Sequence, residues 1–489
     1  MLIDQLSQFP PERIALQTLD SAITYQALIT QVNDLSDWLV LNDIKSVALF
    51  GENKPQWLIV DLACQTANII FTPVPAFFSS HQIIHLLDSV QPTLLFADQT
   101  FQQDLLITKQ ALVSPIAEFK VFKLADKKLA NIPQNTSKIT FTSGSTGEPK
   151  GVCLSIENQL NVANALVKKI AIDAPVHLCL LSFATLLENI AGVYAPLLSG
   201  GTIWIISDVE RGFNGAELTN LNKLLNIISI SKPQTLILVP ELLQVLLLGI
   251  RKGWQPPKEL EFIAVGGSKV SEKLITQAKL IGLPVYQGYG LSECGSVVSI
   301  NSKSTANATG VGEVLEHLST EIINGELIVI GNSFLGYLEL PDSWYQDKVA
   351  TGDLVTIVNG NLEIKGRTKS LIINSYGRNI SPEWLESELT ATGLFRQAIV
   401  FGDSKPFCIA ILVPLSADIP RDKIQLALTE LNKTLPVYAQ IHGFIFLPQP
   451  MTFIDGLVTS NGRPKRSAIA QHYNKEISQL YSNHLQTSN

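Results

Sequence analysis

The segment Lys138–Gly151, KITFTSGSTGEPKG, is the sharpest local signal in the chain. Its first four residues predict a β-strand, and a loop rich in glycine, serine and threonine follows. Glycines allow backbone N–H groups to approach an anion closely, hydroxyl groups add donors, and Lys150 adds positive charge. In parallel sheets, ligands bind at loops that follow the carboxyl ends of strands. The segment therefore predicts a phosphate-binding loop.

The spacing of this loop differs from that of the P-loop of nucleoside triphosphatases, in which Gly-Lys is followed by serine or threonine. A flexible surface turn is the alternative interpretation for a Gly/Ser-rich stretch. The ending Pro149-Lys150-Gly151 favours a ligand-binding loop over that alternative.

On both sides of the loop, apolar β-branched runs alternate with stretches of helical periodicity. Amphipathic spacing predicts helices at Gln56–Ala67 and His81–Ser89. The runs predicted to form strands are KSVALFG (45–51), NIIFTPVP (68–75), PTLLFAD (92–98), GTIWIIS (201–207), QTLILVP (234–240), LEFIAVGG (260–267) and LPVYQGYG (283–290). Near-continuous apolar strands, each followed by a helix, are typical of parallel sheets covered on both faces. The predicted fold class is α/β.

After about Gly310 the pattern changes. GELIVIG (325–331), DLVTIVNG (353–360) and NLEIKG (361–366) predict short strands whose Gly/Asn turns favour antiparallel pairing. Helix is then expected at Pro382–Leu389 and Pro420–Leu435, and strand at Gln397–Gly402 and Cys408–Pro414. We therefore expect a large N-terminal domain over residues 1–367 and a small α+β domain over residues 368–489, with a hinge in the polar stretch near Lys369.

Size and composition agree with this organisation. The chain has 489 residues, which is more than one hydrophobic core usually supports. Lys and Arg number 36 against 43 Asp and Glu, so the formal net charge is −7. Non-specific nucleic-acid binding needs clustered positive charge, and this balance argues against a nucleic-acid partner.

The cysteines and the apolar stretches bear on the cellular compartment. The five cysteines are scattered without a C-x-x-C pair, so the spacing suggests no zinc site and no disulfide framework. The N-terminus has no secretory pattern, and apolar stretches such as Leu236–Ile250 contain charge or proline. We therefore expect a cytoplasmic protein without a transmembrane segment, which leaves peripheral membrane contact possible.

The loop SGSTGEPKG (143–151) resembles the signature of the adenylate-forming (AMP-binding) superfamily. YGLSE (289–293), TGD (351–353) and GRTKSLIINSYGRNISPEWLE (366–386) follow in the order of that superfamily, so the resemblance covers nearly the whole chain. The phrase NSYGRNISPEWLE (374–386) looks closest to the long-chain acyl-CoA synthetase branch. The resemblance implies a large domain of layered, mostly parallel sheets with an antiparallel distorted barrel, followed by a small mobile α+β domain.

The resemblance also implies a reaction. The chain would join a carboxylic acid to AMP, release pyrophosphate and then transfer the acyl group, with ATP, Mg²⁺ and coenzyme A as cofactors. Because both reactants are anionic, the site must neutralise charge and hold the attack geometry. By resemblance, Lys150, Thr146, Glu293 and Arg463 are the catalytic residues, and Glu293 is the magnesium ligand.

The remaining site residues are nucleotide contacts by resemblance. Tyr289 would lie against adenine, Ser292 would touch the α-phosphate, and Asp353 would bind the ribose hydroxyls beside Arg367. The nucleotide-binding set is completed by Thr142, Ser143, Gly144, Ser145, Gly147, Gly267 and Gly290. Considered alone, each residue also has an ordinary structural explanation. A tyrosine at a strand end can belong to the core, a Gly-Asp pair can form a turn, and an arginine beside glycine can be a solvated charge.

One position departs from the superfamily pattern. Where the superfamily usually carries a lysine after glycine, TSNGRPKR (459–466) has Arg463, and Lys465 follows two residues later. Either residue could supply the charge, and arginine is not interchangeable with the compact ammonium of lysine. The same departure keeps open a family member that binds nucleotide without turnover.

The acid and the acceptor are less defined. Phe183 aligns with the position where amino-acid-activating relatives carry an aspartate, and burying an unpaired ammonium there would be costly. An acid with an apolar tail, fatty or aryl, is therefore expected rather than an α-amino acid. Coenzyme A is the expected acceptor, and an acyl-carrier protein or an amine stays possible.

Overall fold

The computed structural model describes residues 1–102, 109–124, 130–143, 149–214, 217–305, 310–368, 370–416, 419–452, 455–459 and 463–487. The chain forms two compact units. The first unit comprises Met1–Gly267, Leu283–Glu321 and Ile328–Ala350. The second comprises Ser268–Gly282, Ile322–Leu327 and Thr351–Asn489.

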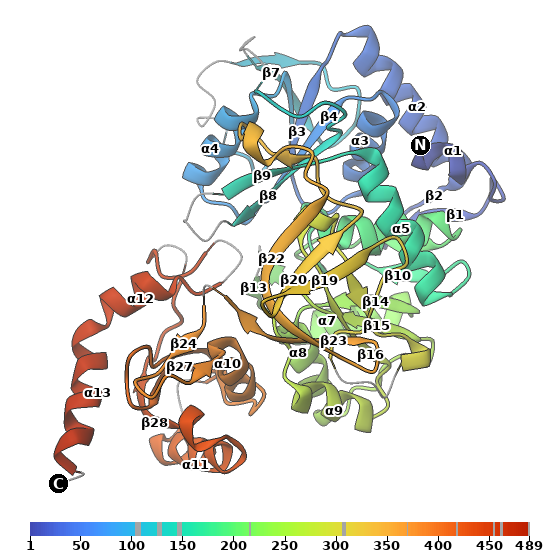
Figure 1. Cartoon of the computed structure of the whole chain (residues 1–489). Helices are drawn as coiled ribbons and strands as arrows, with labels where there is room; N and C mark the ends of the chain where they lie inside the picture. The colour runs from blue at the N-terminus through green and yellow to red at the C-terminus, as the bar shows by residue number, and fades with distance from the viewer. Residues whose placement is uncertain are drawn as a thin grey trace. The chain divides into compact units, whose positions relative to one another are not determined.

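The first unit contains a nine-stranded sheet in the order β18-β17-β16-β15-β14-β10-β11-β1-β2. Its strands β10, β14, β15 and β16 are labelled in Figure 1. Neighbouring strands from β16 to β1 are parallel, and β2, β17 and β18 pair antiparallel at the two edges. The bounds are β1 Ile14–Gln17, β2 Ala22–Thr24, β10 Val176–Leu178, β11 Thr202–Trp204, β14 Thr235–Leu238, β15 Phe262–Val265, β16 Val285–Tyr289, β17 Ser299–Ile300 and β18 Glu313–Val314. A parallel centre buried on both faces confirms the α/β fold class.

A second sheet of this unit has eight strands in the order β21-β9-β8-β4-β3-β5-β7-β6. The strands β5, β3, β4 and β8 are parallel, and the outer strands pair antiparallel. The bounds are β3 Ser46–Phe50, β4 Ile70–Val74, β5 Leu94–Ala97, β6 Lys109–Leu112, β7 Lys120–Leu124, β8 Lys138–Ser143, β9 Pro149–Leu154 and β21 Gly336–Tyr337.

Helices pack on these sheets (Figure 1). Their bounds are α1 Leu2–Leu6, α2 Tyr25–Leu41, α3 Pro55–Thr66, α4 Ser80–Val90, α5 Ile156–Ile170, the π-helix η2 Glu188–Tyr194, α6 Ala195–Leu198, α7 Leu221–Ser231 and α8 Pro240–Arg251. Ser155 caps α5 in a reciprocal capping box with Asn158, and proline begins α3 and α8. No helix in the described ranges is long and apolar enough to cross a membrane.

Antiparallel strands follow, as the sequence predicts. They form the sheet β19-β20-β22-β23, and the boundary between the units falls within it. The bounds are β19 Ser319–Ile323, β20 Glu326–Ile330, β22 Lys348–Val358 and β23 Asn361–Arg367. β22 and β23 pair antiparallel, with Asp353 opposite Arg367.

The C-terminal part of the second unit is built on the sheet β26-β27-β28, with bounds Phe395–Phe401, Cys408–Pro414 and Ile441–Phe446. Alternate residues of its strands face opposite sides, as the two-residue period of a strand requires. Cys408, Ala410 and Leu412 share a core with α10 Pro382–Thr390 and α11 Arg421–Thr434. Ile411 and Val413 share a different core with α12 Arg466–His472. The other elements of the unit are α9 Glu272–Leu280, β24 Ile372–Ile373, β25 Asn379–Ile380 and α13 Asn474–Thr487.

A buried ion pair joins three elements of the first unit. Lys138 on β8 lies 3.0 Å from a carboxylate oxygen of Asp61 on α3, and both side chains are almost inaccessible to solvent. Asn189 and Tyr194 of η2 complete the hydrogen bonds around the ammonium group. Burial lowers the pKa of Lys138, because the charged form is desolvated. The charge is tolerated because Asp61, Asn189 and Tyr194 all accept hydrogen bonds from the ammonium group.

We predict that Asp61→Asn lowers the free energy of unfolding by about 3–5 kcal/mol, because the ammonium of Lys138 would stay buried without its anion. The exposed pair Lys348–Glu321 in the same unit provides the control, and Glu321→Gln should cost about 1 kcal/mol or less. Urea denaturation of both variants measures the difference. Equal, small losses in the two variants would show that the buried pair does not stabilise the fold.

Candidate active site

The predicted phosphate loop connects two antiparallel strands. β8 is parallel to β4, but the strand after the loop, β9, pairs antiparallel with β8, with Thr142 opposite Lys150. The loop is therefore the turn of a hairpin rather than a strand-to-helix connection. Gly144, Ser145, Thr146 and Gly147, together with the side chain of Ser143, lie outside the described residues.

Lys150 projects from the start of β9 into solvent, and its ammonium nitrogen lies 5.6 Å from the ring centre of Tyr337. The hydroxyl of Tyr337 donates a 2.8 Å hydrogen bond to Glu293. Burial and the charge of Glu293 both raise the pKa of Tyr337, so this group stays a neutral donor. The structure thus brings Lys150 and Glu293, 143 positions apart in the chain, to one tyrosine.

Tyr337 was not among the residues selected from the sequence. It belongs to the short strand β21, which pairs with β9, and its role depends on that pairing. The dipeptide Gly336-Tyr337 carries no motif that the sequence analysis used. Only the proximity of strands from distant parts of the chain reveals it.

The segment YGLSE leaves the sheet at the carboxyl end of β16. Tyr289 ends the strand, and Ser292 and Glu293 lie in a short 3₁₀ turn. The backbone carbonyl of Glu293 accepts a 2.7 Å hydrogen bond from Phe334 N–H. Gly290 packs so closely that a Cβ atom there would lie 1.7 Å from the carbonyl oxygen of Ser296. Gly267, just after β15, has a φ of +83°, a conformation that favours glycine.

In the second unit, Asp353 and Arg367 form an ion pair across β22 and β23. Arg367 Nε donates to one carboxylate oxygen at 2.7 Å, and a terminal nitrogen donates to the other oxygen at 3.4 Å. The carboxylate of Asp353 is buried, whereas half of the Arg367 side chain is exposed. These two residues, which the sequence analysis expected beside the same ribose hydroxyls, are therefore direct neighbours.

Arg463 and Lys465 flank Pro464, which forms an isolated antiparallel β-bridge with Val458 in this unit. The backbone of Arg463 exchanges hydrogen bonds with Thr459, at 2.7 Å and 3.0 Å. Residues 460–462 and Lys369, where the hinge was predicted, lie outside the described residues. The boundary after residue 367 stays a prediction.

An apolar cavity of about 50 Å³ lies within the first unit, bounded by α5, η2, α6 and the nine-stranded sheet. Leu187, Ala191, Ala264 and Val297 are among its apolar lining residues. The polar lining residues are His177, Thr235 and Ser199, and the first two are hydrogen-bonded to each other at 2.8 Å. The cavity therefore suits an apolar group.

Phe183 lies in the core of the first unit. Its ring is buried against Trp57, with ring centres 5.4 Å apart. Among the described residues, the lining of the cavity includes Leu187 but not Phe183. The lining of this cavity does not test whether Phe183 faces the acid, so that expectation stays a prediction.

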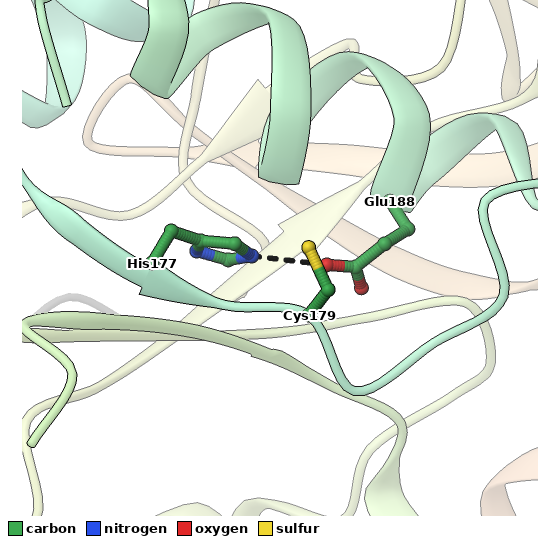
Figure 2. A group of neighbouring side chains, drawn as sticks. All are labelled: His177, Cys179 and Glu188. Atoms are coloured by element: carbon green, nitrogen blue, oxygen red, sulfur yellow. Dashed lines mark hydrogen bonds and ion pairs between the residues drawn. The ribbon is translucent and has the colours of Figure 1, made fainter. Parts of the chain in front are cut away.

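A group of metal-ligand type adjoins the cavity: His177, Cys179 and Glu188 (Figure 2). Their ligand atoms lie within 4.8 Å of one another, although the cysteine spacing suggested no zinc site. His177 Nε2 and Glu188 Oε1 are 2.9 Å apart, and the other carboxylate oxygen accepts from Leu181 N–H. Burial and the neighbouring Glu188 raise the pKa of Cys179. We interpret the group as a buried hydrogen-bonded network.

The sequence matches the AMP-binding enzyme family over residues 3–337 and the AMP-binding enzyme C-terminal domain family over residues 369–485. The chain belongs to the AMP-binding enzyme family. The predicted resemblance to adenylate-forming enzymes of the long-chain acyl-CoA synthetase type is thereby confirmed, and so is the general class of ligase.

Two curated relatives and one solved enzyme illustrate the range of this family. Long-chain-fatty-acid–CoA ligase 5 of Mus musculus is 24% identical over 94% of this chain and 84% of its own length. D-alanine–D-alanyl carrier protein ligase of Staphylococcus haemolyticus is also 24% identical, over 97% and 99%. o-Succinylbenzoate CoA synthetase of Bacillus subtilis, solved with an acyl-adenylate, has a TM-score of 0.77 at 20% identity, over 95% and 97%. The same enzyme with ATP and a magnesium ion gives 0.75 at 20% identity, over 95% and 98%.

We predict that Gly290→Ala lowers the free energy of unfolding by at least about 3 kcal/mol, because the new methyl group would overlap the Ser296 carbonyl. Gly282→Ala is the control, since its φ is +86° but no atom lies within 4 Å. Strain in the left-handed region should cost that variant about 1–2 kcal/mol. Chemical denaturation compares the two, and a Gly290→Ala variant as stable as Gly282→Ala would contradict the close packing described for YGLSE.

Proposed function

We propose that this protein activates a carboxylic acid with ATP, forming an acyl-adenylate and pyrophosphate, and then transfers the acyl group to coenzyme A. One observation carries the proposal: Lys150 and Glu293 both contact Tyr337, next to the β8–β9 hairpin that holds the predicted phosphate loop. A cation for phosphate and a carboxylate for a metal ion are thereby held in one unit of the structure. Family membership supports the same reaction.

In the proposed reaction, the carboxylate of the acid attacks the α-phosphorus of ATP in line with the departing pyrophosphate. Lys150 offsets negative charge on the β- and γ-phosphates, with hydroxyls from Ser143, Ser145 and Thr146. The carboxylate of Glu293 fits Mg²⁺, which prefers oxygen ligands, and Tyr337 holds that carboxylate in place. The metal ion, when bound, would neutralise phosphate charge. The protein's contribution is chiefly positioning and electrostatic stabilisation.

The nucleoside would be bound by residues of the other motifs. Tyr289 would lie against the adenine ring and Ser292 would contact the α-phosphate. The carboxylate of Asp353 would accept hydrogen bonds from the ribose hydroxyls. Arg367, already paired with Asp353, keeps this carboxylate oriented.

The cavity supports an acid with an apolar tail, fatty or aryl. His177 and Thr235 already satisfy each other, so the lining offers little to a polar tail. The relatives named above act on a long-chain fatty acid in one case and on o-succinylbenzoate in another, and both have substantial apolar parts. Because one relative is a D-alanine–D-alanyl carrier protein ligase, an amino acid is the alternative substrate to test.

Transfer to a carrier protein is the second candidate for the last step. The carrier-protein ligase of Staphylococcus haemolyticus matches this chain along nearly the full length of both. Nucleotide binding without turnover is the remaining alternative, because of Arg463 at the position of the usual lysine.

The decisive experiment is acid-dependent exchange of labelled pyrophosphate into ATP. We expect exchange with fatty or aryl acids to exceed exchange with α-amino acids, because the cavity is apolar. Adding coenzyme A or a carrier protein then shows which thiol is acylated. Folded protein that binds ATP but supports no exchange with any acid would favour the non-catalytic alternative.

We predict that Arg463→Ala slows adenylate formation by about 10²-fold or more, the usual scale for one charge-stabilising group. Lys465→Ala should have a much smaller effect, because Pro464 fixes the backbone between the two residues. Lys433→Ala, at an exposed ion pair on α11, serves as a charge-matched control. Single-turnover adenylation measures all three. The reverse order of effects would show that Lys465 replaces the superfamily lysine.

A further inference from the structure

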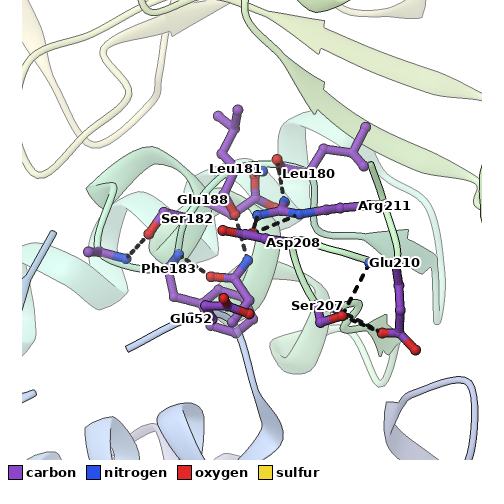
Figure 3. Close-up of polar contacts among 12 residues, drawn as sticks. Glu52, Leu180, Leu181, Ser182, Phe183, Glu188, Ser207, Asp208, Glu210 and Arg211 are labelled. Carbon is purple, nitrogen blue, oxygen red and sulfur yellow. Dashed lines mark hydrogen bonds and ion pairs between the residues drawn. The ribbon is translucent and has the colours of Figure 1, made fainter. Parts of the chain in front are cut away.

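The backbone of residues 180–183 is held by side chains from three separate segments of the first unit (Figure 3). This segment follows β10 and precedes η2. Its neighbours in the chain, His177 and Leu187, both line the apolar cavity. The segment therefore connects two cavity-lining residues.

Asn53 makes the first contact. It follows β3, and its amide group donates a 2.7 Å hydrogen bond to Leu181 O and accepts a 2.8 Å bond from Phe183 N–H. These residues are 128 and 130 positions from Asn53 in the chain. Only 4% of Asn53 is exposed, so water offers little replacement for either bond.

Arg211 makes the second contact, from the segment after β11. Its guanidinium group donates a 2.5 Å hydrogen bond to Leu180 O and also pairs with Asp208 (Figure 3). The ring of Phe213 lies 4.9 Å from the guanidinium carbon. Asp208 in turn faces Glu52, whose pKa is raised by burial and by the nearby Asp208 and Asp98 carboxylates.

Glu188, the first residue of η2, makes the third contact by accepting a 3.2 Å hydrogen bond from Leu181 N–H. Its other oxygen meets His177, so the same carboxylate touches a cavity-lining residue (Figure 2). A Cβ atom on Gly192 would lie 2.4 Å from this carboxylate and 2.7 Å from His177 Nε2. Single π-turns are frequent at functional sites, and here the π-helix makes room for the carboxylate at Gly192.

We propose that Asn53, Arg211 and Glu188, here called the backbone clamp, are positioning residues for the acid substrate. The inference rests on the proposed function. The clamp fixes the chain between His177 and Leu187, and thereby the width of the cavity at η2. Losing one contact leaves the fold largely intact but lets this segment shift. A shift on the scale of 1 Å in a positioning element can lower catalysis by about 10²-fold.

The chain provides a matched control for Asn53. In the second unit, the amide of Asn432 donates to Ile441 O at 2.8 Å and accepts from Ile441 N–H at 2.9 Å. Asn53→Ala and Asn432→Ala therefore remove the same pair of side-chain-to-backbone bonds. A purely structural role predicts similar consequences in the two variants.

The test measures acid-dependent pyrophosphate exchange in wild-type protein, Asn53→Ala, Asn432→Ala and Arg211→Lys. In Arg211→Lys, the ammonium group keeps the positive charge beside Asp208. It lacks the planar guanidinium group that contacts Asp208 and Leu180 O at the same time. We expect kcat/KM for the acid to fall about 10²-fold in Asn53→Ala and in Arg211→Lys, while KM for ATP changes less than about twofold. Asn432→Ala should keep the wild-type KM for the acid.

Each outcome decides the inference. A wild-type KM for the acid in folded Asn53→Ala and Arg211→Lys would overturn the clamp and leave the proposed function standing. The clamp would also be overturned if Asn53→Ala and Asn432→Ala lost activity equally, whether the acid or ATP is the varied substrate. If Asn53→Ala fails to fold, Arg211→Lys against wild-type protein carries the test. Absence of exchange in wild-type protein with every acid overturns the proposed function, and this inference with it.

Discussion

The buried contact between Lys138 and Asp61 is the constraint on which most of the first unit depends. A charged pair removed from water is stable only when each remaining donor and acceptor is satisfied. Asn189 and Tyr194 of η2 supply those partners. Lys138 begins β8, the strand that leads into the predicted phosphate loop. Its ion pair and the hydrogen bonds around it therefore connect the β8–β9 hairpin to η2, the helix at the apolar cavity.

The same helix begins with a second buried charge. Glu188 is satisfied by His177 and Leu181 N–H rather than by a lysine. The space for its carboxylate exists because residue 192 has no side chain. Gly290 plays a similar part in YGLSE, where the backbone of Ser296 comes too close for any Cβ atom. At both places another group comes closer to the glycine backbone than a Cβ atom would allow.

The charged residues to which the proposed reaction assigns roles differ in their exposure to solvent. Lys150 is exposed and reaches Tyr337 only through its ring face, whereas Asp353 is buried and already paired with Arg367. An exposed lysine can move to meet a phosphate, while a buried, paired carboxylate is preorganised for hydroxyl groups. This difference suits a reaction in which pyrophosphate departs while the nucleoside stays bound.

The sequence by itself indicated many of the local elements, the order of the motifs and the family. The strand Cys408–Pro414 was predicted to the residue, because a short continuous apolar run is visible among neighbours along the chain. The sequence also selected Asp353 and Arg367, although their contact depends on the β22–β23 register. Their roles, like those of Gly144–Gly147, remain predictions.

Only the tertiary structure decided which residues meet across long separations. The antiparallel run of β9, the place of Tyr337 beside Glu293, and the burial of Phe183 against Trp57 all arise from the packing of distant segments. The contacts of Asn53 with residues 181 and 183 span about a quarter of the chain. Side-chain hydrogen bonds to backbone leave no periodic trace in sequence, because any segment has the same backbone groups to offer.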